Sequence, residues 1–172
     1  MFTATHLTNV LRTVRRMLVV LPLLVAGCGG DDGPLSSRER NELARARVRW
    51  NASVARDAYR YEIRLSCFCP SELGQWNTVT VVNGLVTAVV SGRGDVVPPA
   101  EWGQYTTVDR LFAVIDARDD PYLADVQARY DSQYGYPVEV SFTARPGLAD
   151  SDITYFARNL QPIPVTRGAS GS

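Results

Sequence analysis

The residues most able to do chemistry are two cysteines separated by a single residue, Cys67 and Cys69, in the stretch "YEIRLSCFCPSE". Paired thiols can form a structural disulfide, act as a redox pair or bind a soft metal ion. A metal site would need further soft or nitrogen ligands, and the third cysteine, Cys28, lies far away in the sequence. A redox pair usually needs a cation or a helix N-terminus that lowers one thiol pKa. We predict a disulfide, with a redox or soft-metal pair as the alternative.

The residue types that the chain lacks exclude several kinds of catalytic site. The one histidine, His6, lies in an N-terminal segment that we expect to be removed, and the sequence has no lysine. Without these residues the mature chain cannot build a Ser-His-Asp triad, a histidine-ligated metal site or a lysine Schiff base. A pair of carboxylates, as in glycoside hydrolases, stays open. We therefore expect a protein that is not an enzyme and that uses no cofactor or metal.

The N-terminal segment has the pattern of an export signal that ends at a lipid attachment site. Three arginines precede the apolar run "MLVVLPLLV", which is shorter than the about 20 residues of a membrane-spanning helix. The next residues complete "LVAGC", which resembles the lipobox of bacterial lipoproteins and ends at Cys28. The resemblance implies that residues 1–27 are a signal peptide and that Cys28 is acylated. An ordinary secretory signal with a chance cysteine is the alternative.

The remainder of the chain divides into three parts. Residues 28–37 are small and polar, which indicates a flexible tether, residues 38–164 form one domain, and residues 165–172 form a disordered tail. We expect a lipid-anchored protein of the bacterial cell envelope that faces the periplasm or the exterior, in the outer membrane if there are two membranes. Its partners would be the membrane and an unidentified envelope protein. The whole sequence has 18 basic residues, three of them in the signal peptide, and 18 acidic residues. These charges are interspersed, so we expect no nucleic acid partner.

Residues 59–69 alternate between apolar and polar types, which predicts a half-buried β-strand. In this pattern both cysteines point to the core side, and Pro70 ends the strand because proline cannot donate to a β-ladder. Two extended residues span roughly 6.5 Å, near the upper limit of the Cα separation in a disulfide. The predicted disulfide therefore requires a bend at Phe68, which breaks the alternation.

The other patterns predict an α+β fold with an antiparallel sheet of about six strands. A capping-box pattern at Ser36 and Glu39 indicates an N-terminal helix, whose apolar stripe would be formed by Leu43, Ala46 and Trp50. Thr106 with Asp109 gives a second such pattern and predicts a central amphipathic helix to about Arg118. Further strands are expected near residues 126–130, 138–142 and 153–163.

The clearest local pattern is Asn83-Gly84 between two β-rich runs, which predicts a type I′ hairpin. That turn pairs Val82 with Leu85 and Val81 with Val86, and it places Val79, Val81, Val86 and Ala88 on the core side. Together with the helices, the strands predict the core residues Tyr61, Ile63, Leu65, Val79, Val81, Leu111, Phe112, Ile115, Val138 and Val140.

Four aromatic residues in loops, Trp76, Trp102, Tyr134 and Tyr136, are candidates for an exposed patch that binds a partner. The alternative is that they pack their own loops. A binding role of this kind, or a structural one, is the function that we expect of the domain. Thiol-redox or soft-metal chemistry at the pair Cys67 and Cys69 is the alternative.

The segments "YRYEIRLSCFC", "VTVVNGLV", "TVDRLFAVI" and "ARYDSQYGYPVEV" resemble, in order and spacing, a family of bacterial lipoproteins defined by a domain of unknown function, DUF6174. The resemblance covers about Trp50 to Leu160. It implies an envelope lipoprotein with a small α+β domain. It implies no activity and no catalytic residues.

Overall fold

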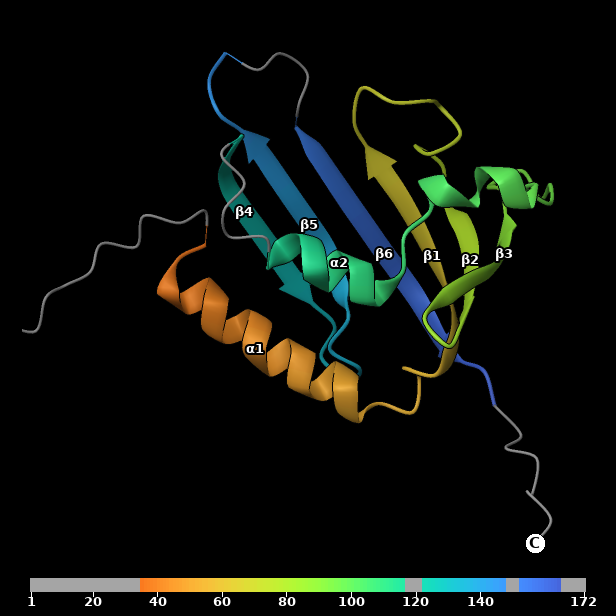
Figure 1. Ribbon diagram of the computed structural model, residues 1–172, viewed down its shortest axis with the longest axis horizontal. Coiled ribbons are helices and arrows are strands. Elements are labelled where there is room, and N and C mark those ends of the chain that lie inside the picture. Colours follow the sequence, from red (N-terminus) through yellow and green to blue (C-terminus); the bar gives the residue numbers. More distant parts are fainter. Residues whose placement is uncertain (1–34, 117–121, 148–151, 165–172) are drawn as a thin grey trace, which may run out of the picture. The chain divides into compact units, whose positions relative to one another are not determined.

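The computed structural model describes residues 35–116, 122–147 and 152–164 (Figure 1). The predicted signal peptide, Cys28 and the predicted tail lie outside the described residues. The predicted tether extends to residue 37, but the side chain of Leu35 is only 2% exposed and belongs to the hydrophobic core. The described domain therefore includes Leu35, and its start lies before the predicted residue 38.

One six-stranded sheet with the strand order β3-β2-β1-β6-β5-β4 forms the frame of the domain. All neighbouring strands are antiparallel. The central pair, β1 and β6, joins segments from the two ends of the domain (Figure 1). The α+β fold class with an antiparallel sheet is thus confirmed. The strands are β1 (Ala58–Ser66), β2 (Asn77–Val82), β3 (Leu85–Val90), β4 (Leu123–Tyr130), β5 (Pro137–Ala144) and β6 (Ile153–Pro162).

Two α-helices, α1 (Ser37–Ala52) and α2 (Val108–Ile115), lie on the same face of the sheet (Figure 1). The predicted capping box begins α1, because the Ser36 hydroxyl accepts a hydrogen bond from the Glu39 N–H and the Glu39 carboxylate accepts one from the Ser36 N–H. Neither of these helices has the length and apolar character that a bilayer-spanning helix needs. The buried stripe of α1 consists of the predicted residues Leu43, Ala46 and Trp50.

The central helix α2 starts later than predicted. Its N-cap is Thr107, whose hydroxyl accepts a hydrogen bond from the backbone N–H of Arg110. The prediction of Thr106 as the cap is wrong because either of two adjacent threonines can cap a helix, and tertiary contacts decide between them. The helix ends at Ile115, whereas the predicted end at Arg118 lies outside the described residues. A short 3-10 helix, η1 (Pro99–Gln104), precedes α2.

Two buried tyrosines of β1 hold the start of α2 against the sheet. The Tyr59 hydroxyl accepts a hydrogen bond from the Val108 N–H at 2.8 Å, and the Tyr61 hydroxyl donates one to the Thr106 carbonyl at 2.5 Å. The first N–H groups of a helix have no partner within the helix, so Tyr59 satisfies one of them. Burial raises the pKa of both hydroxyl groups, which keeps them neutral and able to make these bonds.

The hairpin between β2 and β3 has the predicted turn. Asn83 and Gly84 have φ angles of 51° and 76°, as both central residues of a type I′ turn require. The pairs beside the turn are the predicted ones, Val82 with Leu85 and Val81 with Val86.

Beyond these pairs a β-bulge shifts the register, so that Thr80 pairs with Ala88 and Val79 with Val89. One extra residue in a strand reverses which side chains face the core. The prediction that Ala88 faces the core is therefore wrong, and Val89 is buried in its place. The remaining residues predicted for the core are buried, except that Leu65, Val86 and Val138 are partly exposed at the margin of the core.

Candidate functional site

The strand that leads to the cysteine pair ends earlier than predicted. Because β1 ends at Ser66, the residues Cys67, Phe68 and Cys69 form a bend, and both cysteines are half-buried. The prediction that they point to the core side of a strand is therefore wrong. A disulfide joins them across a Cα separation of 5.2 Å, shorter than the roughly 6.5 Å of an extended pair. The required bend is present at Phe68, whose side chain is 90% exposed.

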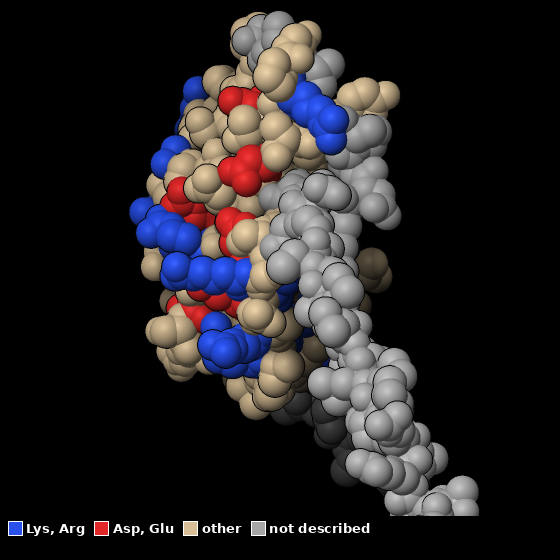
Figure 2. All heavy atoms as spheres, turned by 90° about the vertical axis from the view of Figure 1, so that its left-hand side faces the viewer, with Lys and Arg blue, Asp and Glu red and all other residues tan. Residues whose placement is uncertain are grey.

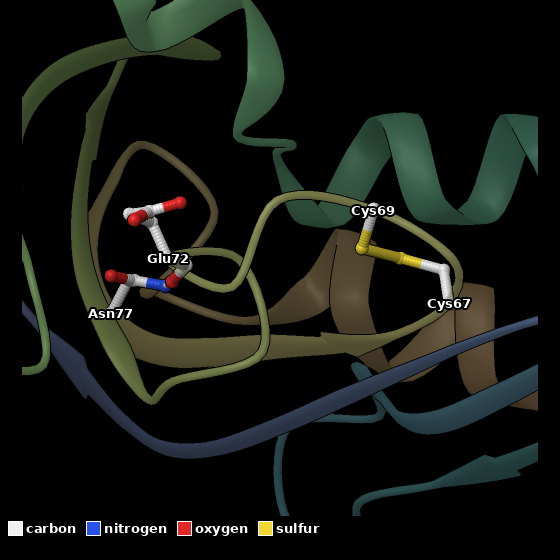
Figure 3. Close-up of a disulfide and its surroundings, with 4 residues drawn as sticks. All are labelled: Cys67, Cys69, Glu72 and Asn77. Carbon is white, nitrogen blue, oxygen red and sulfur yellow. Dashed lines mark hydrogen bonds between the residues drawn. A yellow bond between two sulfur atoms is a disulfide. The ribbon is translucent and has the colours of Figure 1, made fainter.

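A single buried amide holds the disulfide loop, defined as residues 67–76. Asn77 is 1% exposed, and its Nδ2 donates hydrogen bonds to the carbonyl oxygens of Glu72 and Gln75, each at 2.9 Å. Its Oδ1 accepts one from the Gly92 N–H in the next loop, at 3.3 Å. Figure 3 shows Asn77 beside the Glu72 backbone, at the other end of the loop from the disulfide. Asn77 therefore fixes the conformation of both loops.

The disulfide lies apart from other groups that could bind a metal. In the described parts of the chain, no group of three or more histidine, cysteine, aspartate or glutamate residues is arranged to hold a metal ion. The sulfur atoms of Cys67 and Cys69 are joined to each other. The chemistry at this position is thus that of a half-buried disulfide beside an exposed phenylalanine.

A groove of about 400 Å³ between α1 and α2 contains two carboxylates. The Trp50 indole N–H donates to Asp109 at 2.8 Å, and the Arg47 guanidinium donates to Asp116 at 3.2 Å. Arg47 also donates to the Phe112 carbonyl at 3.0 Å. A glycoside hydrolase needs one carboxyl group as a proton donor and one as a base or nucleophile. Asp109 and Asp116 instead accept hydrogen bonds from α1, so both carboxylates make contacts that join the two helices.

The sheet face opposite the helices, which we call the open face, is not covered by any described element. The residues of β1 that point to it include Arg64, which pairs with Phe156 on β6. Trp76 lies next to Arg64 on the other side, since the following residue, Asn77, pairs with Ile63. The guanidinium carbon of Arg64 lies 4.2 Å from the Phe156 ring centroid and 5.1 Å from that of Trp76.

Arg158 on β6 completes this arrangement. Its guanidinium carbon lies 3.9 Å from the Trp76 ring centroid, and its Nε donates to the Glu62 carboxylate at 2.7 Å. That hydrogen bond is the main cause that holds the pKa of Glu62 below its ordinary value. The open-face cluster, defined as Arg64, Trp76, Phe156 and Arg158, therefore combines two half-buried aromatic rings with two cations, of which Arg158 is exposed. An ionised glutamate lies at its border.

The edge formed by α1 and β4 has a different character. Figure 2 shows arginine and acidic side chains interspersed along it. Some of them are paired, such as Arg38 with Glu42 at 3.0 Å and Arg129 with Glu139. Charges of both signs at such short spacing produce no strong field of one sign. This edge therefore offers less to a charged partner than the open-face cluster does.

Comparison with known proteins assigns the chain to a family. Residues 42–162, from within α1 to the end of β6, match the family of unknown function DUF6174. The chain belongs to this family. No curated protein and no solved structure matches the chain. The resemblance to DUF6174 noted in the sequence is confirmed, and the open-face cluster lies within the matched range.

Of the four aromatic residues that the sequence offered as a binding patch, Trp76 alone belongs to the open-face cluster of this DUF6174 domain. Tyr136 is buried, and Tyr134 is partly buried against the core. The Trp102 indole N–H donates to a carbonyl of its own loop at 3.0 Å, and its ring packs on the core. Three of the four therefore pack against the core of the domain and do not form the exposed patch, and of these Trp102 also bonds within its own loop.

The other members of the cluster were not identified from the sequence. The alternation in residues 59–69 does place Arg64 on the polar side of a strand, which was a usable signal. Phe156 and Arg158 lie far along the chain, and their position depends on the pairing of β6 with β1. Asn77 was also missed, although an asparagine at the first position of the alternating run Asn77, Val79, Val81 is a polar residue at a core position.

Proposed function

We propose that this DUF6174 protein is a lipid-anchored protein of the bacterial cell envelope whose domain binds a partner protein and performs no catalysis. The binding role is supported by one observation above all, the open-face cluster. Tryptophan and arginine are enriched among the residues that contribute most to protein–protein affinity. Here they lie together on a sheet face that no described element covers.

The anchoring role is supported by the sequence before the domain. The run "LVAGC" follows arginines and a short apolar segment, and it ends at Cys28. Acylation there would hold the domain at the membrane surface, facing the periplasm or the exterior. The mature chain would also lack histidine and lysine, which supports binding over catalysis.

Metabolic labelling with an alkyne fatty acid tests the anchor. We expect label on the wild-type protein and none on Cys28→Ser, which should also leave the membrane fraction. The matched control replaces both Cys67 and Cys69 by serine and should keep the label. Equal labelling of Cys28→Ser and wild type would contradict the anchor.

Photocrosslinking tests the binding role. A photoreactive residue at Thr80, which pairs with Arg60 on the open face, should give a discrete crosslinked product in cells. The same residue at Val54, which is exposed after α1, should not. The product should disappear in Trp76→Ala, and its persistence in that variant would show that the open-face cluster is not the binding surface.

The alternative function is thiol-redox or soft-metal chemistry at Cys67 and Cys69, and the exposed bend at Phe68 makes the pair accessible. We propose a structural disulfide instead, because an exported protein meets an oxidising compartment. In protein isolated from the envelope, mass spectrometry should find both thiols alkylated only after reduction. Alkylation without reductant would favour the redox or metal function.

A further inference from the structure

We infer that the open-face cluster binds a carboxylate group carried by a side chain of the partner protein, and that Arg64 is the residue that contacts it. The inference rests on the proposed binding function and adds the chemistry of the ligand. Arg64 lies at the centre of the cluster, between the rings of Phe156 and Trp76.

The first argument is the bonding state of Arg64. Among the residues that the structure describes, Arg64 makes contacts with two aromatic rings, and no oxygen accepts a hydrogen bond from its guanidinium. A guanidinium has five N–H donors in a fixed fork that matches a carboxylate in two parallel hydrogen bonds. The rings restrict the side chain without using these donors, so the fork is held ready for a ligand.

The second argument is the contrast with the other arginines of the open face. Arg158 is paired with Glu62, Arg129 is paired with Glu139, and Arg60 donates to a glutamine oxygen of β6 at 3.0 Å. Each of these arginines thus has an acceptor within the domain. Arg64 is the exception, and a carboxylate from outside would complete the same pattern of pairing at the centre of the cluster.

The third argument separates a carboxylate from a phosphate. Glu62 is ionised at the border of the cluster, and Glu139 pairs with Phe156 across β5 and β6. Both carboxylates are already paired with arginines, Arg158 and Arg129. Among the described residues of the site, Arg64 is therefore the charge without an acidic partner, which a monoanionic carboxylate balances and a dianionic phosphate exceeds. The aromatic rings beside Arg64 add apolar contact area, which favours a protein side chain and its neighbours over an isolated ion.

Nuclear magnetic resonance on the full chain in detergent micelles tests the inference. The probe is a capped pentapeptide with one glutamate between two phenylalanines and a glycine at each end, compared with its glutamine counterpart. The glutamate peptide should shift the Nε–H signal of Arg64, and the glutamine peptide should not. Arg64→Gln should weaken binding by about tenfold or more, as expected for a charged hydrogen-bonded pair. Arg64→Lys should retain part of it, because lysine keeps the charge but not the fork.

The matched control is Arg60→Gln, on the same face but bonded to the neutral Gln161 side chain, which should bind the peptide as the wild type does. Equal binding of the glutamine peptide, or wild-type affinity in Arg64→Gln, would overturn the inference. So would binding of inorganic phosphate or of phosphatidylglycerol vesicles through Arg64 when the glutamate peptide does not bind. If Arg64→Gln does not fold, Arg64→Lys decides, since undiminished affinity there would remove the role of the fork.

The outcome is separate from that of the proposed function. A protein that is labelled at Cys28 and crosslinked from Thr80, but that does not bind the glutamate peptide, contradicts the carboxylate site alone. A protein that binds the peptide through Arg64 but carries no lipid contradicts the anchor alone. If the protein binds the peptide through Arg64 but gives no crosslinked product from Thr80, the partner uses another surface.

Discussion

Asn77 provides a sharp test of how the domain is held together, because one buried side chain joins two loops. Its Nδ2 donates to two carbonyl oxygens at 2.9 Å each, and its Oδ1 accepts from Gly92. Asn77→Asp keeps the shape and the acceptor but replaces the donor by a second oxygen. At neutral pH that oxygen would be a buried negative charge against two carbonyl oxygens.

The expected cost follows from these contacts. Asn77→Ala removes three hydrogen bonds, at about 1 kcal/mol each, so it should lower the free energy of unfolding by about 3 kcal/mol. Asn77→Asp should cost about 3–5 kcal/mol near neutral pH, because the charge is buried without a partner. Either loss is a large part of the stability of a typical domain, about 5–15 kcal/mol.

The pH dependence of stability separates the loss of hydrogen bonds from the effect of the buried charge in Asn77→Asp. The protonated aspartic acid can donate to a carbonyl, so folding favours protonation and raises the pKa of the introduced carboxyl above its unfolded value of about 3.9. The variant should therefore be closest to wild type below about pH 4 and should lose stability as the pH rises through its folded pKa.

Urea unfolding, followed by tryptophan fluorescence between pH 3 and pH 8, measures this difference. The control is Asn51→Asp, an exposed position in the last turn of α1, where the helix dipole should cost at most about 1 kcal/mol. If Asn77→Asp costs no more than this control, or if its cost does not change with pH, the assigned hydrogen bonds do not hold the loops.

Three further perturbations test the core, the turns and the open face. Phe112→Ala should lower the free energy of unfolding by about 3–5 kcal/mol, since the ring is buried, and an unchanged melting temperature would refute its burial. Gly84→Ala should lower the free energy of unfolding by about 1 kcal/mol, because Gly84 has a positive φ but an added methyl group would meet nothing. Gly135→Ala should lower it by well over that amount, because Gly135 also has a positive φ and its methyl group would overlap α1. Equal urea midpoints for the two variants would refute this. The Glu62 pKa is lowered by Arg158, so wild type should lose stability relative to Glu62→Gln as the pH falls below about 5, and parallel curves of stability against pH would show that the pair contributes nothing.

The features that the sequence predicted well are those determined by neighbours within a few residues. The capping box at Ser36 and Glu39 and the turn at Asn83-Gly84 both depend on local hydrogen bonds and backbone angles, and both are present. The presence of strands was also predictable, because the alternation of apolar and polar residues is a local pattern. The choice of Thr107 over Thr106 as the cap of α2 was not predictable in this way, because Tyr61 on β1 binds the Thr106 carbonyl.

The errors arise where a strand changes course. The bulge between β2 and β3 exchanges Ala88 for Val89 at the core, and no glycine or proline marks it. At the end of β1, a correct alternation was extended beyond Ser66 into the bend that holds Cys67. Alternation shows which residues suit a strand, but backbone hydrogen bonds to a partner determine where the strand stops.

The candidate site was the least predictable part because it depends on the partner strand of β1. Arg64 could be placed on a polar face from the sequence, yet its rings come from β6 and from the end of the disulfide loop. This origin has a consequence for function. Arg64 and Phe156 lie on paired strands at the centre of the sheet, and Asn77 fixes the backbone next to Trp76. A long, flexible cation is thereby restricted before any ligand arrives, so less side-chain entropy is lost on binding. An arginine with unused donors is therefore better suited to recognition here than it would be on a mobile loop.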